Sequence, residues 1–289
     1  MPDDVTSLWL VAAWTLGLVL ILALVVGLLW LRLRRIRLQV EARYLEAVAD
    51  HCHSGHVLDT AERFAQLPGE RVRNLLGSLS GPGLIVSPAM WQSRGWLRYD
   101  GDDRERLVSA RTWCVPGRWW AQIRRVRLRL LGWIDEIHEV EQGVVRSHYW
   151  WLGLYRVRRP GFGPSPLSLQ AQAVGETVLV PWGWFVEGAI DWETTAGKEP
   201  WRGRISATGH EVRLFLDPAG RPSAIELREF GLSGCMRVEF GGWHWSGRAL
   251  LPDHLRLIEN FGSVNEFTRL EVYLAVPERV PPAGRSPDC

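Results

Sequence analysis

The sequence predicts an α+β protein in which an N-terminal transmembrane helix precedes a mainly antiparallel β-domain with one inserted helix. Three observations predict this class. An uncharged run opens the chain, apolar and polar residues alternate with a period of two from about residue 90 onward, and one helical segment near residue 170 interrupts that alternation. Groups of strands separated by a single helix are typical of α+β proteins rather than of regular βαβ folds.

The uncharged run extends from Val5 to Leu31 and is followed at once by an arginine cluster that begins at Arg32. A helix rises about 1.5 Å per residue, so roughly 20 residues match the hydrocarbon core of a bilayer. A cleaved signal peptide would have a basic flank and a small-residue cleavage site, and the sequence has neither. We therefore predict a short tail at 1–7 and an uncleaved membrane anchor at 8–31, which makes the bilayer a partner.

The orientation of this anchor follows from the distribution of Lys and Arg around it. No basic residue precedes the span, whereas Arg32, Arg34, Arg35, Arg37 and Arg43 follow it. The positive-inside rule predicts an external N-terminus and a cytoplasmic C-terminal part at a bacterial inner membrane; a periplasmic or extracellular domain is the alternative. The four cysteines are widely scattered, unlike those of small disulfide-stapled exported domains, which favours the cytoplasmic side.

Composition restricts the classes of partner. The formal net charge is only +2 over 289 residues, so no basic surplus indicates a nucleic-acid partner. Tryptophan is frequent, with 17 residues. Its large ring and single N–H donor suit aromatic-lined cavities and surfaces near lipid headgroups, although core packing explains any one of them equally well.

The helical elements come first in the chain. Residues 32–66 are predicted to form a juxtamembrane helical stalk, because apolar residues recur at a spacing of three and four between charges. A second helix is expected from Glu70 to about Ser80, where Gly81-Pro82-Gly83 ends it.

The globular domain is predicted to span 67–276, with a disordered polar tail at 277–289. Its inserted helix is expected at about 167–180, before Pro181. The expected strands are 93–99, 106–114, 119–131, 133–140, 202–208, 210–216, 223–230, 236–245, 254–260 and 267–276.

Several short motifs occur in a characteristic order between residues 62 and 276. They are Leu67-Pro68-Gly69-Glu70-Arg71-Val72-Arg73, Pro116-Gly117-Arg118-Trp119, Glu176-Thr177-Val178-Leu179-Val180-Pro181, Phe215 to Pro222, and Trp243 to Arg248 followed by Leu251-Pro252. In this order the chain resembles an uncharacterised bacterial family of domains of unknown function, although Val180 stands where an aromatic residue is common. The resemblance implies a curved half-barrel sheet, similar to bacterial lipoprotein carriers, with a covering helix over an apolar concave face. It implies no catalytic residues, and fold alone does not fix function.

The segment 125–130 alternates arginine with apolar residues, so Arg125, Arg127 and Arg129 share one face of a strand. We hypothesise that these guanidinium groups contact an anionic headgroup, with Trp182 and Trp184 at the rim of the ligand site. A solvated outer face is the alternative for the arginines.

Two further clusters carry chemistry-bearing side chains. Cys52, His53 and His56 are candidate metal ligands, but a closed zinc site needs four ligands and a polar helix end is the favoured interpretation. No cofactor is predicted. The acidic run 135–141 could supply paired carboxylates, but we favour cross-strand pairs with the preceding arginines on a solvated strand face.

The leading functional hypothesis is a non-enzymatic, membrane-anchored domain that holds a lipid or another amphipathic ligand in a Trp-rich concave sheet. The alternative is a membrane-tethered structural or assembly subunit that binds a membrane protein partner. A hydrolase ranks third, because the sequence contains no recognisable nucleophile motif, phosphate loop or dinucleotide fingerprint.

Overall fold

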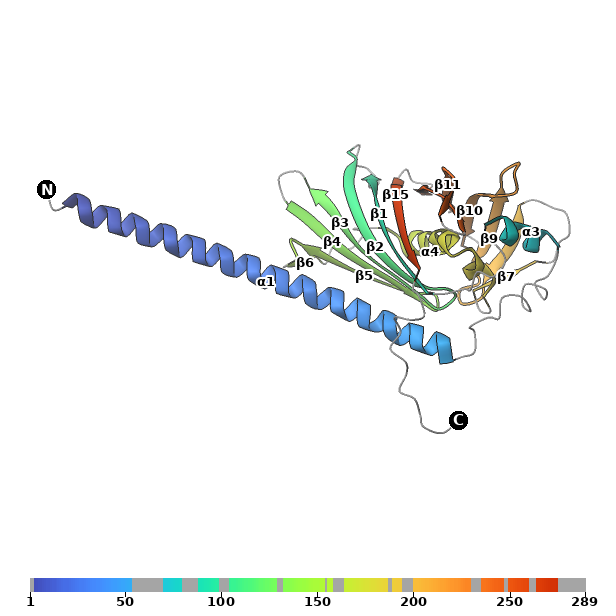
Figure 1. The fold of residues 1–289 in the computed structure, drawn as a ribbon, viewed down its shortest axis with the longest axis horizontal. Coiled ribbons are helices and arrows are strands. Elements are labelled where there is room, and N and C mark those ends of the chain that lie inside the picture. The colour runs from blue at the N-terminus through green and yellow to red at the C-terminus, as the bar shows by residue number, and fades with distance from the viewer. Residues whose placement is uncertain are drawn as a thin grey trace, which may run out of the picture.

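The computed structural model describes residues 3–53, 70–79, 88–98, 104–128, 132–153, 155–157, 164–186, 189–193, 200–229, 235–246, 249–259 and 264–274. Figure 1 shows a long N-terminal helix lying along a strongly curved sheet, with a short helix on the sheet's concave side. The helices are α1 (Asp3–His53), α3 (Glu70–Leu79) and α4 (Pro166–Glu176), and α4 continues into two 3₁₀ turns, η1 (Thr177–Leu179) and η2 (Pro181–Phe185).

The strands fall into two groups on either side of α4. The first group is β1 (Ala89–Arg98), β2 (Arg106–Val115), β3 (Trp119–Leu128), β4 (Gly132–Glu141), β5 (Val144–Trp151) and β6 (Tyr155–Val157). The second group is β7 (Ile190–Trp192), β8 (Trp201–Ile205), β9 (Glu211–Leu216), β10 (Pro222–Arg228), β11 (Cys235–Gly241), β12 (His244–Ser246), β13 (Ala249–Leu251), β14 (His254–Glu259) and β15 (Val264–Leu274).

Within the described residues, thirteen of these strands form one antiparallel sheet in the order β6-β5-β4-β3-β2-β1-β15-β14-β11-β10-β9-β8-β7. The C-terminal strand β15 pairs with β1 and joins the two groups at the middle of the sheet. In the part of the chain that the structure describes, the edge strands β6 and β7 do not pair with each other, so the sheet is open. The predicted class, α+β with a curved antiparallel half-barrel and a covering helix, is confirmed.

Helix α4 lies across the concave side because the chain must pass from edge strand β6 to the opposite edge strand β7. Ser165 caps its first turn by accepting a hydrogen bond from the amide of Ser168, and Pro166 is tolerated at the start of a helix. Gly175 allows close contact with the sheet, since a Cβ atom there would lie 2.7 Å from the side chain of Val238. This contact helps to hold the last turn of α4 against β11.

The C-terminal half of α1 packs on the opposite, outer face of the sheet. Val40 and Val48 are buried against Trp113, Trp119 and their neighbours on β2 to β4. Ion pairs reinforce this contact, because Arg43 binds Glu139 at 2.5 Å. Residues of the predicted stalk therefore lie along the sheet.

The N-terminal half of α1 contains a stretch that is long and apolar enough to cross a membrane, and no part of that stretch is buried. A stretch of this kind near the N-terminus serves as a membrane anchor or as a signal sequence. Its large apolar side chains, such as Leu18 and Leu22, are more than half exposed.

The ten predicted strands match observed strands to within four residues at each end, but β5, β6, β7 and β13 were missed, and the predicted strand 236–245 runs from β11 into β12. The strand β5 reads Val-Val-Arg-Ser-His-Tyr-Trp-Trp, and nearly all of its residues are half-buried. Its sequence therefore lacks the alternation that identifies a strand with one solvated face. The strand β7 has only three residues, which is too short for any periodic pattern.

Candidate functional site

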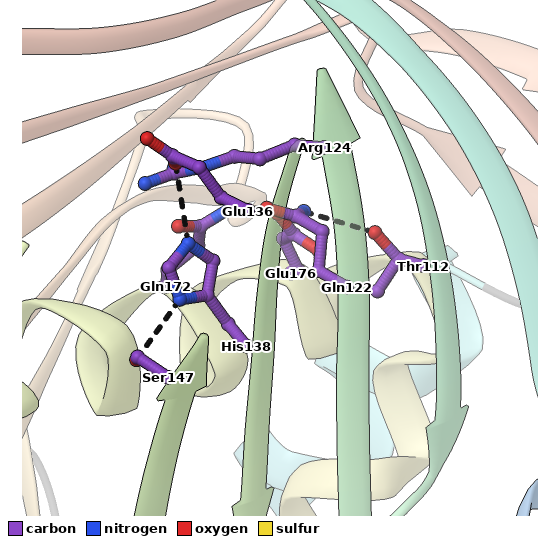
Figure 2. A network of polar contacts seen from close by, with 8 residues as sticks. All are labelled: Thr112, Gln122, Arg124, Glu136, His138, Ser147, Gln172 and Glu176. Carbon is purple, nitrogen blue, oxygen red and sulfur yellow. Dashed lines mark hydrogen bonds and ion pairs between the residues drawn. The ribbon is translucent and has the colours of Figure 1, made fainter. Parts of the chain in front are cut away.

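Alternate residues of β1 to β5 face α4, and this concave surface is called the inner face here. Its middle carries a group of buried polar side chains, the polar belt, which Figure 2 shows projecting from neighbouring strands together with two residues of α4. The polar belt consists of Thr112, Gln122, Arg124, Glu136, His138 and Ser147, with Gln172 and Glu176 from α4.

Arg124 and Glu136 form an ion pair between β3 and β4. The two residues are direct cross-strand partners, and Arg124 Nε donates to Glu136 Oε2. Their side chains are 1% and 0% exposed. Charges removed from water to this degree need each other as partners, because an isolated buried charge costs several kcal/mol. The sequence therefore places a complete charge pair on the inner face.

His138 continues this cluster toward β5. Its Nε2 lies 3.3 Å from Glu136 Oε2 and its Nδ1 lies 3.0 Å from Ser147 Oγ. A carboxylate only accepts, so Nε2 carries the proton, and Nδ1 accepts from the Ser147 hydroxyl. Burial, and then the charge of Arg124, lower the pKa of His138 to about 4.

This chain of contacts orders serine, histidine and carboxylate as hydrolases do, but its electrostatics suit a fixed polar surface better. A general base works best with a pKa near the operating pH, and the pKa of His138 lies well below neutrality. Glu136 is already bound to Arg124. Ser147 is therefore activated less than a catalytic serine requires.

Glu176 is the centre of the second part of the polar belt. Its carboxyl group accepts from the indole nitrogens of Trp91 and Trp120 at 3.2 Å each. It also accepts from Gln122 at 3.0 Å and from Gln172 at 2.7 Å. Burial raises the pKa of Glu176, while these four donors oppose that rise. The carboxyl group thus ties α4 to β1 and β3 on the inner face.

The lowered pKa of His138 predicts acid sensitivity. The unfolded chain binds a proton at the ordinary pKa of about 6.5, whereas the folded protein does not until about pH 4. The free energy of unfolding therefore decreases as the pH falls through this window. Below pH 6.5 the slope is about 1.4 kcal/mol per pH unit, so the loss between pH 7.5 and pH 5 is about 2 kcal/mol. Unfolding of the detergent-solubilised full chain by denaturant measures this loss.

The matched control for this prediction is His138→Gln, which removes the titrating group. The raised pKa of Glu176 acts in the opposite direction, because its contribution grows as the pH falls. The unmodified protein and His138→Gln both retain that effect, so the difference between their acid sensitivities isolates His138. Equal acid sensitivity of the two proteins would exclude a buried neutral histidine.

An apolar group lies next to the polar belt on the same inner face. It comprises Leu97, Val108, Ala110 and Val126, each at most 6% exposed, and is called the apolar end. Val126 is two residues beyond Arg124 on β3, and Val108 is its cross-strand partner. The inner face therefore changes from charged to apolar within two residues along β3.

The opposite end of the inner face holds a small cavity of about 100 Å³ near α4 and η2. Cys114, Trp120, Val174, Trp184 and Ile190 contribute to its mainly apolar lining. An engineered apolar cavity of about 150 Å³ takes up benzene, so this cavity is too small for a whole lipid. It can accommodate only a small apolar group.

The candidate arginines lie on the outer face of the sheet. Arg125 is 47% exposed, binds Asp135 at 2.7 Å, and lies 5.0 Å from the ring centroid of Trp133. Arg127 is exposed on the same face, and Arg129 lies outside the described residues. The inner face instead receives Arg124, which precedes the alternating segment 125–130 and was not among the candidates.

The other candidate residues are not brought to one site. Trp184 is 1% exposed, donates to the carbonyl of Val174 and packs beside Phe240, so it lies in the core rather than at a rim. The side chains of Trp182, Cys52 and His53, and all of His56, lie outside what the structure describes. Among the described residues, no group of three His, Cys, Asp or Glu side chains could hold a metal ion.

The expected pairing of the acidic run is confirmed, but its expected solvation is wrong. Glu136 and His138 face inward and Asp135 faces outward, as the alternation predicts, and Arg124 and Arg125 bind the two carboxylates. Glu136 and His138 are nevertheless fully buried. Because α4 and the other strand group enclose the concave side, the inner face is not solvated. The sequence did contain a signal for this buried cluster. Arg124 precedes the alternating arginines on one predicted strand, and Glu136 and His138 are two residues apart on the next strand.

No protein-family profile and no curated protein matches the chain. Among solved structures it is similar to a LolA superfamily protein from Nitrosomonas europaea, with 10% identity and a TM-score of 0.45 over 74% of this chain and 97% of the other. It is also similar to an outer membrane lipoprotein-sorting protein domain from Vibrio parahaemolyticus, with 13% identity and a TM-score of 0.40 over 75% and 93% of the two chains. A DUF1329 family protein from Desulfovibrio piger gives 10% identity and a TM-score of 0.40 over 76% and 95%. These are similarities of fold, of the kind that the sequence motifs predict.

Proposed function

We propose that the protein is a membrane-anchored binding domain that holds a lipid or a related amphipathic molecule against the inner face of its half-barrel. The observation that carries this proposal is the direct succession of the apolar end and the polar belt on one concave surface. An amphipathic ligand has the same succession of an apolar chain and a polar group. Ligand sites in proteins generally combine apolar walls with a few placed polar groups.

The polar belt supplies groups that suit the polar part of such a ligand. Arg124 offers a guanidinium group beside Glu136, and a guanidinium matches phosphate or carboxylate oxygens. Among the described residues, Ser93 Oγ and Gln172 Oε1 are buried polar atoms without a hydrogen-bond partner. Unpaired buried groups cost about 1–3 kcal/mol each, so a polar ligand group that bonds them would be favoured.

The anchor is the second part of the proposal. The exposed apolar stretch of α1 supports a membrane span, and the arginines that follow it support an external N-terminus and a cytoplasmic sheet. The span would hold the sheet beside a reservoir of amphipathic molecules. This location favours the lipid over a water-soluble ligand.

Native mass spectrometry of the detergent-purified full chain, with extraction of co-purified lipid, tests the proposal. We expect a stoichiometric lipid on the unmodified protein and its loss in Ala110→Trp, since the indole ring fills the apolar end. Ser109→Trp is the control, because Ser109 is exposed on the outer face of the same strand.

The full chain is needed, because α1 contributes buried contacts to the outer face. Lipid that only surrounds the anchor would be lost equally from both variants or from neither. That result, or a ligand-free unmodified protein, would overturn tight lipid binding on the inner face. Thermal unfolding of both variants separates ligand loss from misfolding.

A further inference from the structure

One end of the sheet carries a cluster of exposed and half-exposed aromatic residues beside α1. Trp133 is the second residue of β4, Trp151 ends β5 and Tyr155 begins β6. Strand pairing places Trp151 opposite both Ile134 and Tyr155. Tyr155 is 65% exposed, and its ring lies 6.2 Å from that of Trp151. These three residues, with the exposed Arg127 and Arg156, are called the rim.

The rim lies beside the point where α1 leaves the sheet. Gly153, between β5 and β6, packs on Leu33 so closely that a Cβ atom there would lie 3.1 Å from the leucine side chain. The guanidinium of Arg32 lies 4.2 Å from the ring centroid of Trp150 on β5. Figure 1 shows the ends of β3, β4 and β6 reaching along α1 toward its projecting N-terminal half.

The position of this contact fixes the distance from the proposed membrane span. Leu33 is two residues beyond the end of 8–31, which corresponds to about 3 Å along the helix axis. The headgroup layer is roughly 5–7 Å thick on each side of the hydrocarbon core. Helix α1 therefore leaves no spacer between the span and the sheet.

We propose that the rim inserts into the headgroup layer of the bilayer that α1 crosses. Trp and Tyr favour this layer because each combines an apolar ring with a polar tip. Arg127 and Arg156, and the arginines of α1 at 32, 34 and 35, complement lipid phosphates. The apolar end, with Leu97, Val108 and Val126, lies toward the same end of the sheet. The inner face thus receives its ligand from the bilayer side.

This inference rests on the proposed anchor, and photo-crosslinking of the full chain tests it. p-Benzoylphenylalanine is introduced at Tyr155, which has similar size, and the protein is reconstituted into vesicles of phosphatidylcholine and phosphatidylglycerol. Mass spectrometry then detects lipid adducts after irradiation. The matched control site is Val144, which is 54% exposed at the opposite end of β5.

We expect lipid adducts at position 155 and at least ten-fold fewer at position 144. Equal adduct yields at the two positions, or none at 155, in protein that floats with the vesicles would overturn insertion of the rim while leaving the anchor intact. Protein that fails to float with the vesicles would overturn the anchor as well. Flotation therefore separates the two failures.

Discussion

Replacing Arg124 by Met is expected to destabilise the protein by about 3–5 kcal/mol, because Glu136 then loses its cationic partner in a fully buried position. A domain of this size loses about 2–4 °C of melting temperature per kcal/mol, so the expected decrease is roughly 6–20 °C. Circular dichroism of the detergent-solubilised full chain during heating measures it.

Two further variants show whether this loss comes from the buried charge. Arg146→Met removes an exposed ion pair with Glu141, whose members are 47% and 49% exposed, and should cost at most about 1 kcal/mol. Arg124→Met combined with Glu136→Leu removes both buried charges and should recover a large part of the stability, less the hydrogen bond that His138 loses. Similar losses for Arg124→Met and Arg146→Met would contradict the buried ion pair. These variants also remain informative when the Arg124→Met protein does not fold.

Replacing Glu176 by Leu is expected to cost about 3–5 kcal/mol, because four buried N–H donors lose their shared acceptor. The cost is smaller than four separate penalties, since Leu also removes the desolvated carboxyl group. Near-ultraviolet circular dichroism should change as well, because the acceptor of Trp91 and Trp120 is lost. Denaturant unfolding gives the free energy.

Glu176→Gln is the matched comparison for this effect. It keeps one acceptor oxygen and the side-chain volume, but its amide nitrogen donates where the indoles also donate, so an intermediate loss of about 1–3 kcal/mol is expected. Thr177→Ser is a control at the next position in the chain. It retains the hydroxyl that donates to the carbonyl of Ala173, so little loss of stability is expected. A Glu176→Leu protein with unchanged stability and near-ultraviolet spectrum would show that the carboxyl group does not organise the inner face.

Local sequence patterns predicted the elements and their faces. The uncharged run indicated a helix that could cross a membrane, and period-two alternation located most strands. The same alternation separated Glu136 and His138 from Asp135 before any long-range contact was known. These predictions succeed because side-chain direction along a helix or strand depends only on backbone geometry.

The sequence by itself therefore determined the order of most elements, the two faces of the strands it located and the arginine-flanked apolar helix. Only the tertiary structure decided which face became the inner one, because alternation is symmetric and does not say which side another element will cover. Helix α4 covers the face of Arg124 and brings Glu176 to Trp91, 85 residues away, while α1 covers the face of Arg125. The polar belt exists only once these distant elements pack together, and this is the physical reason that its residues could not be selected from the sequence.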